Sequence, residues 1–162
     1  MGKSFIEIQK IRQIWVVILM LLVNALAIYH FAFDLTAFVE FAPILIVLFV
    51  DLLLVFFQLK TKINEKGIYY QLFPFHLKEK IFIWDEIAEA NIRKYSPIWE
   101  YGGWGYRYSF KNGKAYNISG NMGLQLVFKN GKKILIGTNK PKELAEFLES
   151  NFPKYLKYKK YE

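Results

Sequence analysis

The sequence contains no cysteine among its 162 residues and only two histidines, His30 and His76. Without cysteine the chain can form no disulfide, no thiolate nucleophile and no cysteine-ligated zinc site. The two histidines lie in different regions, and the sequence has neither a phosphate-binding loop nor a nucleophile elbow. The sequence therefore predicts a protein that is not an enzyme and that uses no metal, no cofactor and no small-molecule substrate.

Formal charge is scarce near the N-terminus. Residues 14–33 carry none, and residues 41–59 carry only that of Asp51. Twenty helical residues extend about 30 Å, which matches the hydrocarbon thickness of a bilayer. We therefore expect a transmembrane helical hairpin over residues 14–59, with an N-terminal segment, 1–13, before it and a second domain, 60–162, after it.

Basic residues flank the two expected spans, whereas the connection between them, residues 34–40, carries only acids. Because Lys and Arg are enriched on cytoplasmic flanks, both termini are expected in the cytoplasm. Residues 60–162 carry nineteen Lys and Arg against ten Asp and Glu. This basic domain would then lie beneath an anionic leaflet, which would attract it.

Asp51 is the only charged residue in the second expected span. In an antiparallel hairpin, Asn24 and Asp51 lie almost equally far from the turn and therefore at similar depth. Three interpretations of this polar contact remain open. The pair fastens the two helices to each other, or Asp51 contacts a basic group on another subunit, or Asp51 is an ion or proton site.

From Lys60 onward the hydrophobic pattern alternates and turn residues recur, which is typical of antiparallel strands. The predicted strands lie near residues 63–73, 80–84, 88–95, 105–110, 114–119, 123–129 and 132–137. The sequence FKNGK occurs twice, at 110–114 and 128–132, and Asn-Gly favours the tight turn of a two-residue hairpin. These turns predict consecutive hairpins of a meander.

One amphipathic helix is expected after the strands. Pro141 suits its first turn, and Glu143 lies near the positive end of the helix dipole. Apolar residues then recur at helical spacing, namely Leu144, Phe147, Leu148, Phe152 and Tyr155. Seven strands and this helix predict a small antiparallel β-barrel capped by a C-terminal α-helix.

Four motifs follow one another in this second domain: WDEI at 84–87, GGWGYR at 102–107, SGNMG at 119–123 and IGTNKP at 136–141. With the two apolar segments before them, they give a chain that resembles the bacterial pleckstrin-homology-like (bPH) membrane proteins. The resemblance implies an α+β membrane protein of the bacterial cytoplasmic (inner) membrane, with two transmembrane helices and a cytoplasmic PH-like domain. It supplies no catalytic residues.

Aromatic residues crowd the GGWGYR motif. They predict an interaction surface formed by Trp99, Tyr101, Trp104, Tyr106 and Arg107. The motif's glycines also suit a purely structural corner between strands. A nucleic-acid platform is not expected, because the positive charge is spread over strands and tail.

Basic and aromatic positions elsewhere predict contacts with membrane lipids. They are Lys60, Lys62, Phe73, Phe75, Lys78, Lys154, Lys157, Lys159 and Lys160.

The sequence as a whole favours a non-catalytic, membrane-anchored interaction module that acts as an accessory or scaffold subunit of an inner-membrane complex. Its expected partners are membrane lipids and either other membrane-protein subunits or a second copy of the chain. One alternative is a PH-like domain that senses anionic lipid. The other is a component of an ion- or proton-driven complex that uses Asp51 directly.

Overall fold

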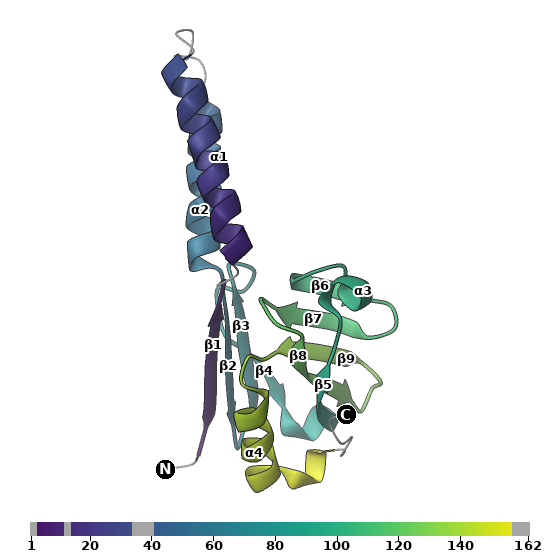
Figure 1. The fold of residues 1–162 in the computed structure, drawn as a ribbon. Helices are drawn as coiled ribbons and strands as arrows, with labels where there is room; N and C mark the ends of the chain where they lie inside the picture. The colour runs from purple at the N-terminus through teal and green to yellow at the C-terminus, as the bar shows by residue number, and fades with distance from the viewer. Residues whose placement is uncertain (1–2, 12–13, 34–40, 157–162) are drawn as a thin grey trace. The chain divides into compact units, whose positions relative to one another are not determined.

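The computed structural model describes residues 3–11, 14–33 and 41–156 (Figure 1). The chain divides into two compact units. Lys10–Phe57 form a helical unit, and Met1–Gln9 together with Gln58–Glu162 form a β unit. The predicted N-terminal segment, 1–13, is therefore divided between the two units.

The helical unit contains two helices that contact each other, α1 (Ile14–Phe33) and α2 (Phe41–Phe56). Their described apolar side chains point outward over most of the surface. Six that are more than half exposed are Leu21, Leu26, Ile28, Leu45, Ile46 and Val55. The helices thus lack the polar face that a helix of a globular protein turns to water.

The prediction of a transmembrane hairpin over residues 14–59 is wrong. Among the residues that the structure describes, no helix is both long enough and apolar enough to cross a membrane. The second apolar stretch does not form one long helix, because α2 ends at Phe56 and a strand begins at Gln58. The 16 residues of α2 extend about 24 Å, less than the roughly 30 Å of a bilayer core.

Three further predictions depended on that hairpin and are corrected with it. They are the fold class of an α+β membrane protein, the location in a bacterial inner membrane, and the cytoplasmic position of both termini. The acidic connection at residues 34–40 lies outside the described residues.

The first sheet of the β unit has four strands in the order β1-β2-β3-β4. Their bounds are β1 Phe5–Lys10, β2 Gln58–Asn64, β3 Gly67–Phe73 and β4 Lys80–Ile83. The sequence analysis missed β1 and predicted one strand over 63–73, where β2 and β3 pair antiparallel around a turn. Strict alternation of buried and exposed residues in FIEIQK identifies β1 as a strand with one face on the core.

Side-chain hydrogen bonds hold β1 to a distant part of the β unit. The carboxylate of Glu7, only 4% exposed, accepts hydrogen bonds from Thr138 Oγ1 at 2.6 Å and from the backbone N–H of Asn139 at 2.7 Å. Gln9 Nε2 donates to the carbonyl of Gly137 at 2.6 Å. A buried carboxylate needs such donors, so these bonds fix the position of β1.

The second sheet has five strands in the order β5-β8-β9-β7-β6. Their bounds are β5 Ile87–Lys94, β6 Gly105–Ser109, β7 Gly113–Asn117, β8 Met122–Phe128 and β9 Lys133–Gly137. The two predicted hairpins are confirmed as antiparallel pairs, β6 with β7 and β8 with β9. Their turns are not the predicted two-residue turns, because three residues separate Ser109 from its partner Gly113, and neither Asn112 nor Asn130 has a positive φ. The predicted meander is wrong, since β7 pairs with β9 in parallel.

The β unit is therefore not the predicted single antiparallel barrel of seven strands. Its described residues form a mixed α/β arrangement of two separate sheets, with one parallel strand pair. Short helical segments join and follow the strands: η2 Trp84–Glu86, α3 Pro97–Tyr101, α4 Pro141–Asn151 and η3 Pro153–Tyr155.

The predicted C-terminal helix is confirmed as α4, with Pro141 in its first turn. Leu144 and Leu148 are its buried residues, and most of the apolar core lies between the inner faces of the two sheets. Fully buried side chains of these faces include Leu59, Ile63, Ile68, Leu124, Leu126 and Ile136. Burying each contributes roughly 1.5–3 kcal/mol to folding.

The two Asn-Gly turns make a matched pair for testing this topology. Gly113 and Gly131 both have positive φ angles, +76° and +80°. A Cβ at Gly113 would lie 2.0 Å from the carbonyl oxygen of Lys133 on the parallel neighbour β9, whereas a Cβ at Gly131 would meet nothing within 4 Å.

We expect Gly131→Ala to lower the free energy of unfolding by roughly 1–2 kcal/mol, the cost of a left-handed alanine. Gly113→Ala should cost roughly 3 kcal/mol or more, because it also forces β7 away from β9. Urea unfolding of the full chain followed by tryptophan fluorescence measures both. Equal losses in the two variants would contradict the parallel β7–β9 pair.

Candidate protein-binding surface

A column of four aromatic rings joins the two sheets, and we call it the aromatic column. Phe82 of β4 stacks on Tyr70 of β3 with ring centroids 4.4 Å apart, and Tyr70 contacts Tyr116 of β7 at 4.7 Å. Tyr116 in turn stacks on Tyr106 of β6 at 5.3 Å. The first three rings are buried and Tyr106 is partly exposed, so the column runs from the core to the surface.

Strand register explains which side chains surround the outer end of this column. Tyr106 lies directly opposite Tyr116, and Tyr108 lies opposite Lys114. Residues two apart on a strand share a face, so Tyr106, Tyr108, Tyr116 and Lys114 all lie on one face of the hairpin. Because β6 is the last strand of its sheet, this part of the face is at the sheet's edge.

Four exposed aromatic residues and the half-buried Lys114 lie together here, and we call them the aromatic surface: Phe75, Tyr106, Tyr108, Phe110 and Lys114. The rings of Phe75 and Tyr106 are 6.3 Å apart, and those of Tyr108 and Phe110 meet edge to face at 5.6 Å. Lys114 Nζ lies 5.7 Å from the Tyr106 ring, within cation–π range. Tyr108 is 61% exposed and Phe110, in the turn, is 98% exposed.

The protonation states of this region are fixed by its surroundings. A hydrogen bond with the Tyr106 side chain, with smaller electrostatic contributions from Tyr106 and Tyr116, raises the pKa of Lys114, so it stays cationic. Burial raises the pKa of Tyr116 and of Tyr70, so both phenols stay neutral. The aromatic surface therefore carries a positive charge.

His76 packs against the side of the aromatic column. Its ring is buried, meets Tyr70 edge to face at 5.5 Å and lies 5.4 Å from Tyr116. Burial lowers the pKa of His76, and the positive charge of Lys80 lowers it further. The ring is consequently neutral at neutral pH.

The opposite face of the second sheet is covered by α3. The Ser96 hydroxyl caps this helix, and the guanidinium of Arg93 binds Glu100 through both carboxylate oxygens, at 3.2 and 2.8 Å. Burial by itself raises the pKa of Glu100, but hydrogen bonds from Arg93 and from the Ser96 N–H outweigh it and leave the pKa below its usual value. With this side of α3 held down, Trp99 projects outward and is 90% exposed.

The structure does not gather the five residues predicted to form an interaction surface. Tyr106 belongs to the aromatic surface, and Trp99 is exposed on α3. Tyr101 is only 4% exposed, so its assignment to a surface is wrong: its ring packs with the buried Tyr95, Ala115 and Leu135.

The other two predicted residues, Trp104 and Arg107, support the interpretation of GGWGYR as a structural corner. Trp104 Nε1 donates to the carbonyl of Gly120 at 3.1 Å, and Arg107 Nε donates to the carbonyl of Trp104 at 2.9 Å. The sequence analysis left Tyr108, Phe110 and Lys114 out of its predicted surface. Their signal was the alternation of Tyr106 and Tyr108 leading into an Asn-Gly turn.

The nine residues predicted to contact lipid are also dispersed. Phe75 joins the aromatic surface, Phe73 is partly buried, and Lys78 is exposed. Lys60 is paired with Glu79 at 2.6 Å, Lys62 lies over the Tyr69 ring at 6.0 Å, and Lys154 lies over the Tyr155 ring at 5.8 Å. Lys157, Lys159 and Lys160 lie outside the described residues.

In the helical unit the structure joins Asn24 and Asp51. Asn24 Nδ2 donates to Asp51 Oδ2 at 2.6 Å and to the carbonyl of Met20 at 2.8 Å. The bond links α1 to α2, as expected if the pair fastens the two helices.

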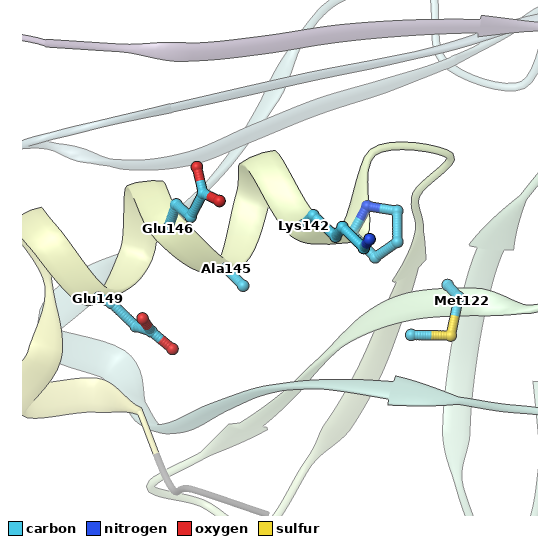
Figure 2. A pocket seen from close by; sticks show the side chains of 6 residues that line it. Met122, Lys142, Ala145, Glu146 and Glu149 are labelled. Carbon is cyan, nitrogen blue, oxygen red and sulfur yellow. The ribbon is translucent and has the colours of Figure 1, made fainter. Parts of the chain in front are cut away.

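A hollow of about 460 Å³ lies beside α4 (Figure 2). It is lined by Met122, Pro141, Lys142, Ala145, Glu146 and Glu149. In Figure 2 the side chain of Ala145 points into the space between α4 and Met122. Within the described ranges no three His, Cys, Asp or Glu side chains gather to hold a metal ion.

Comparison with known proteins finds no protein family, no curated protein and no solved structure that matches this chain. The resemblance to the bPH proteins therefore stays a prediction.

The buried His76 predicts a pH dependence of stability. Its pKa in the folded state is below the ordinary value of 6.5, so below pH 6.5 the unfolded chain binds the proton more readily than the native protein. The free energy of unfolding should fall as the pH drops from 6.5 toward the folded-state pKa of His76. Below that pKa, His76 should cause no further loss. We expect thermal unfolding midpoints of His76→Gln to fall less over this window than those of the unaltered chain. Parallel curves would contradict the assignment.

The Asn24–Asp51 hydrogen bond predicts a difference between two substitutions. Asp51→Asn keeps an acceptor for Asn24, whereas Asp51→Leu removes it at a cost of roughly 1 kcal/mol. Amide hydrogen exchange of α1 and α2 should therefore be about fivefold faster in Asp51→Leu and nearly unchanged in Asp51→Asn. If Asp51→Asn were as disruptive as Asp51→Leu, the charge itself and not the hydrogen bond would be what matters.

Proposed function

We propose that this protein is a non-catalytic interaction module, an accessory or scaffold subunit that binds another protein through the aromatic surface. The observation that supports the proposal best is the exposure of Tyr108 and Phe110 at the edge of an otherwise well-buried sheet. Aromatic side chains supply much of the binding energy at protein interfaces.

The aromatic surface is suited to binding because it is ordered before a partner arrives. Tyr106 is stacked on the buried Tyr116, and its ring faces Lys114. Tyr108 is packed against Phe110. Side chains that already contact one another lose less conformational entropy on binding than free ones.

The helical unit offers a second region for contact. Its described apolar side chains are exposed along both helices, and such large apolar areas mark interaction sites. The Asn24–Asp51 bond holds α1 to α2, which would present the two helices together to a partner. A chain with two separate contact regions suits the role of a scaffold subunit.

Recognition of anionic lipid is the second candidate. Lys3, Lys62 and Lys66 line a small hollow of about 260 Å³ at the end of the first sheet. We rank it below protein binding because Glu65 lines the same hollow, and because Lys60, another residue expected to contact lipid, is already paired with Glu79. An ion- or proton-linked role for Asp51 ranks third, since its carboxylate already accepts the Asn24 amide.

The proposal is tested by cross-linking and mass spectrometry of the tagged full chain, purified from its source cells in a mild detergent that covers the apolar helices. We expect a partner at fixed stoichiometry that is depleted at least about tenfold in the double variant Tyr108→Ala/Phe110→Ala. Tyr69→Ala, a partly exposed tyrosine on the other sheet, is the matched control.

Equal recovery of the partner with the double variant would contradict a role for the aromatic surface. The lipid alternative is tested with vesicles of phosphatidylcholine with and without phosphatidylglycerol. Binding that requires the anionic lipid, is lost in Lys62→Glu and survives in the aromatic double variant would favour that alternative.

A further inference from the structure

The outer edge of β6 is available for pairing. Among the described residues no strand lies beyond β6 in its sheet, so every second residue directs its N–H and C=O away from β7. The opposite edge differs, because Ala90 of β5 forms a bridge with Leu156. The two edges of the second sheet are therefore not equally covered.

Edge strands of natural proteins are usually protected against further pairing by proline, by bulges, by several charged side chains or by a covering helix or loop. Strand β6 has no proline, and its five residues pair with β7 without a break in register. Its one charged residue, Arg107, is exposed, and within the part of the chain that the structure describes its hydrogen bond goes to the carbonyl of Trp104. The strand thus has a regular, accessible edge.

The hairpin that carries this edge is strongly basic. Residues 105–117 include Arg107, Lys111 and Lys114 and no acidic residue. The closest described acid on the neighbouring helix, Glu100, is bound by Arg93 and also accepts a hydrogen bond from Asn112 Nδ2 at 2.9 Å. Lys111 also attracts Glu100, but Arg93 already neutralises that carboxylate, so the hairpin keeps a net positive charge that a ligand can meet.

We propose that β6 binds an extended, acidic peptide segment of a partner protein as an additional strand of the second sheet. The inference rests on the proposed function and names the partner's chemistry. Main-chain hydrogen bonds to the free edge would supply affinity, and alternate side chains would supply specificity.

The faces of β6 define the sequence pattern of this peptide. Tyr106 and Tyr108 lie on one face and Arg107 on the other, because neighbouring residues of a strand point to opposite sides. A strand added beside β6 places its own residues on the same two faces in turn. The peptide should therefore alternate apolar side chains, which contact the tyrosines, with Asp or Glu, which face Arg107.

The experiment begins with a displayed library of random peptides selected on the purified full chain. We expect the selected sequences to alternate apolar and acidic residues. A synthetic peptide of the selected sequence, followed by fluorescence anisotropy, should bind Arg107→Glu and Lys111→Glu at least about tenfold more weakly, with a loss that shrinks at high salt. Lys142→Glu, on α4, is the matched charge control and should bind normally.

The strand pairing is tested on the peptide alone, without disturbing the protein. N-methylation of successive peptide amides should abolish binding at every second position and leave the positions between them unaffected, because only alternate N–H groups face β6. Loss without this alternation, or equal binding to the charge-reversed variants, would overturn the inference.

The outcomes separate the inference from the proposed function. Selected peptides that need Tyr108 and Phe110 but lack acids and alternation overturn strand addition and leave the aromatic surface as a protein-binding site. If selection yields no peptide that prefers the unaltered chain to Tyr108→Ala/Phe110→Ala, the inference is overturned, and the cross-linking experiment alone decides the function.

Discussion

The contact between Tyr70 and Tyr116, with ring centroids 4.7 Å apart, joins the two sheets of the β unit and links its core to its surface. It is made between strands of two different sheets, and an aromatic pair of this kind contributes roughly 0.5–1.5 kcal/mol beyond the area it buries. Tyr116 also stacks on Tyr106, so the exposed ring of Tyr106 packs directly against a buried ring. The core and the candidate binding surface are thus one continuous structure.

Features set by a few neighbouring residues could be predicted from the sequence. Asn-Gly at 112–113 and at 130–131 demands a tight turn, and Pro141 begins a helix, whatever the rest of the chain does. Pairings between distant segments could not. The parallel contact of β7 with β9 depends on the absence of a side chain at Gly113, and the first sheet includes β1, which both helices separate from its neighbour β2. The length of the second apolar run gave too long a helix for α2, because the run extends beyond the helix into β2.

The candidate site, too, could be predicted only where it depends on neighbouring residues. The composition of the sequence drew attention to the aromatic residues around GGWGYR, but some of these residues are buried in the structure and others are exposed. Tyr101 turns inward because Ser96 and Glu100 fix the orientation of α3, whereas Trp99 of the same short helix turns outward. Tyr108 and Phe110 are exposed because β6 ends its sheet. Sheet order is a property of the whole chain, and no local pattern records it.

Strand β1 has a consequence for the order of events during synthesis. Its neighbour β2 is synthesised only after α1 and α2. Thr138 and Asn139, which donate hydrogen bonds to Glu7, are synthesised only after β9, the last strand that the structure describes. Contacts between residues so far apart in sequence form slowly, because the intervening chain must first be brought together. The residues of β1 therefore leave the ribosome before all the strands they depend on and are among the last to reach their native contacts.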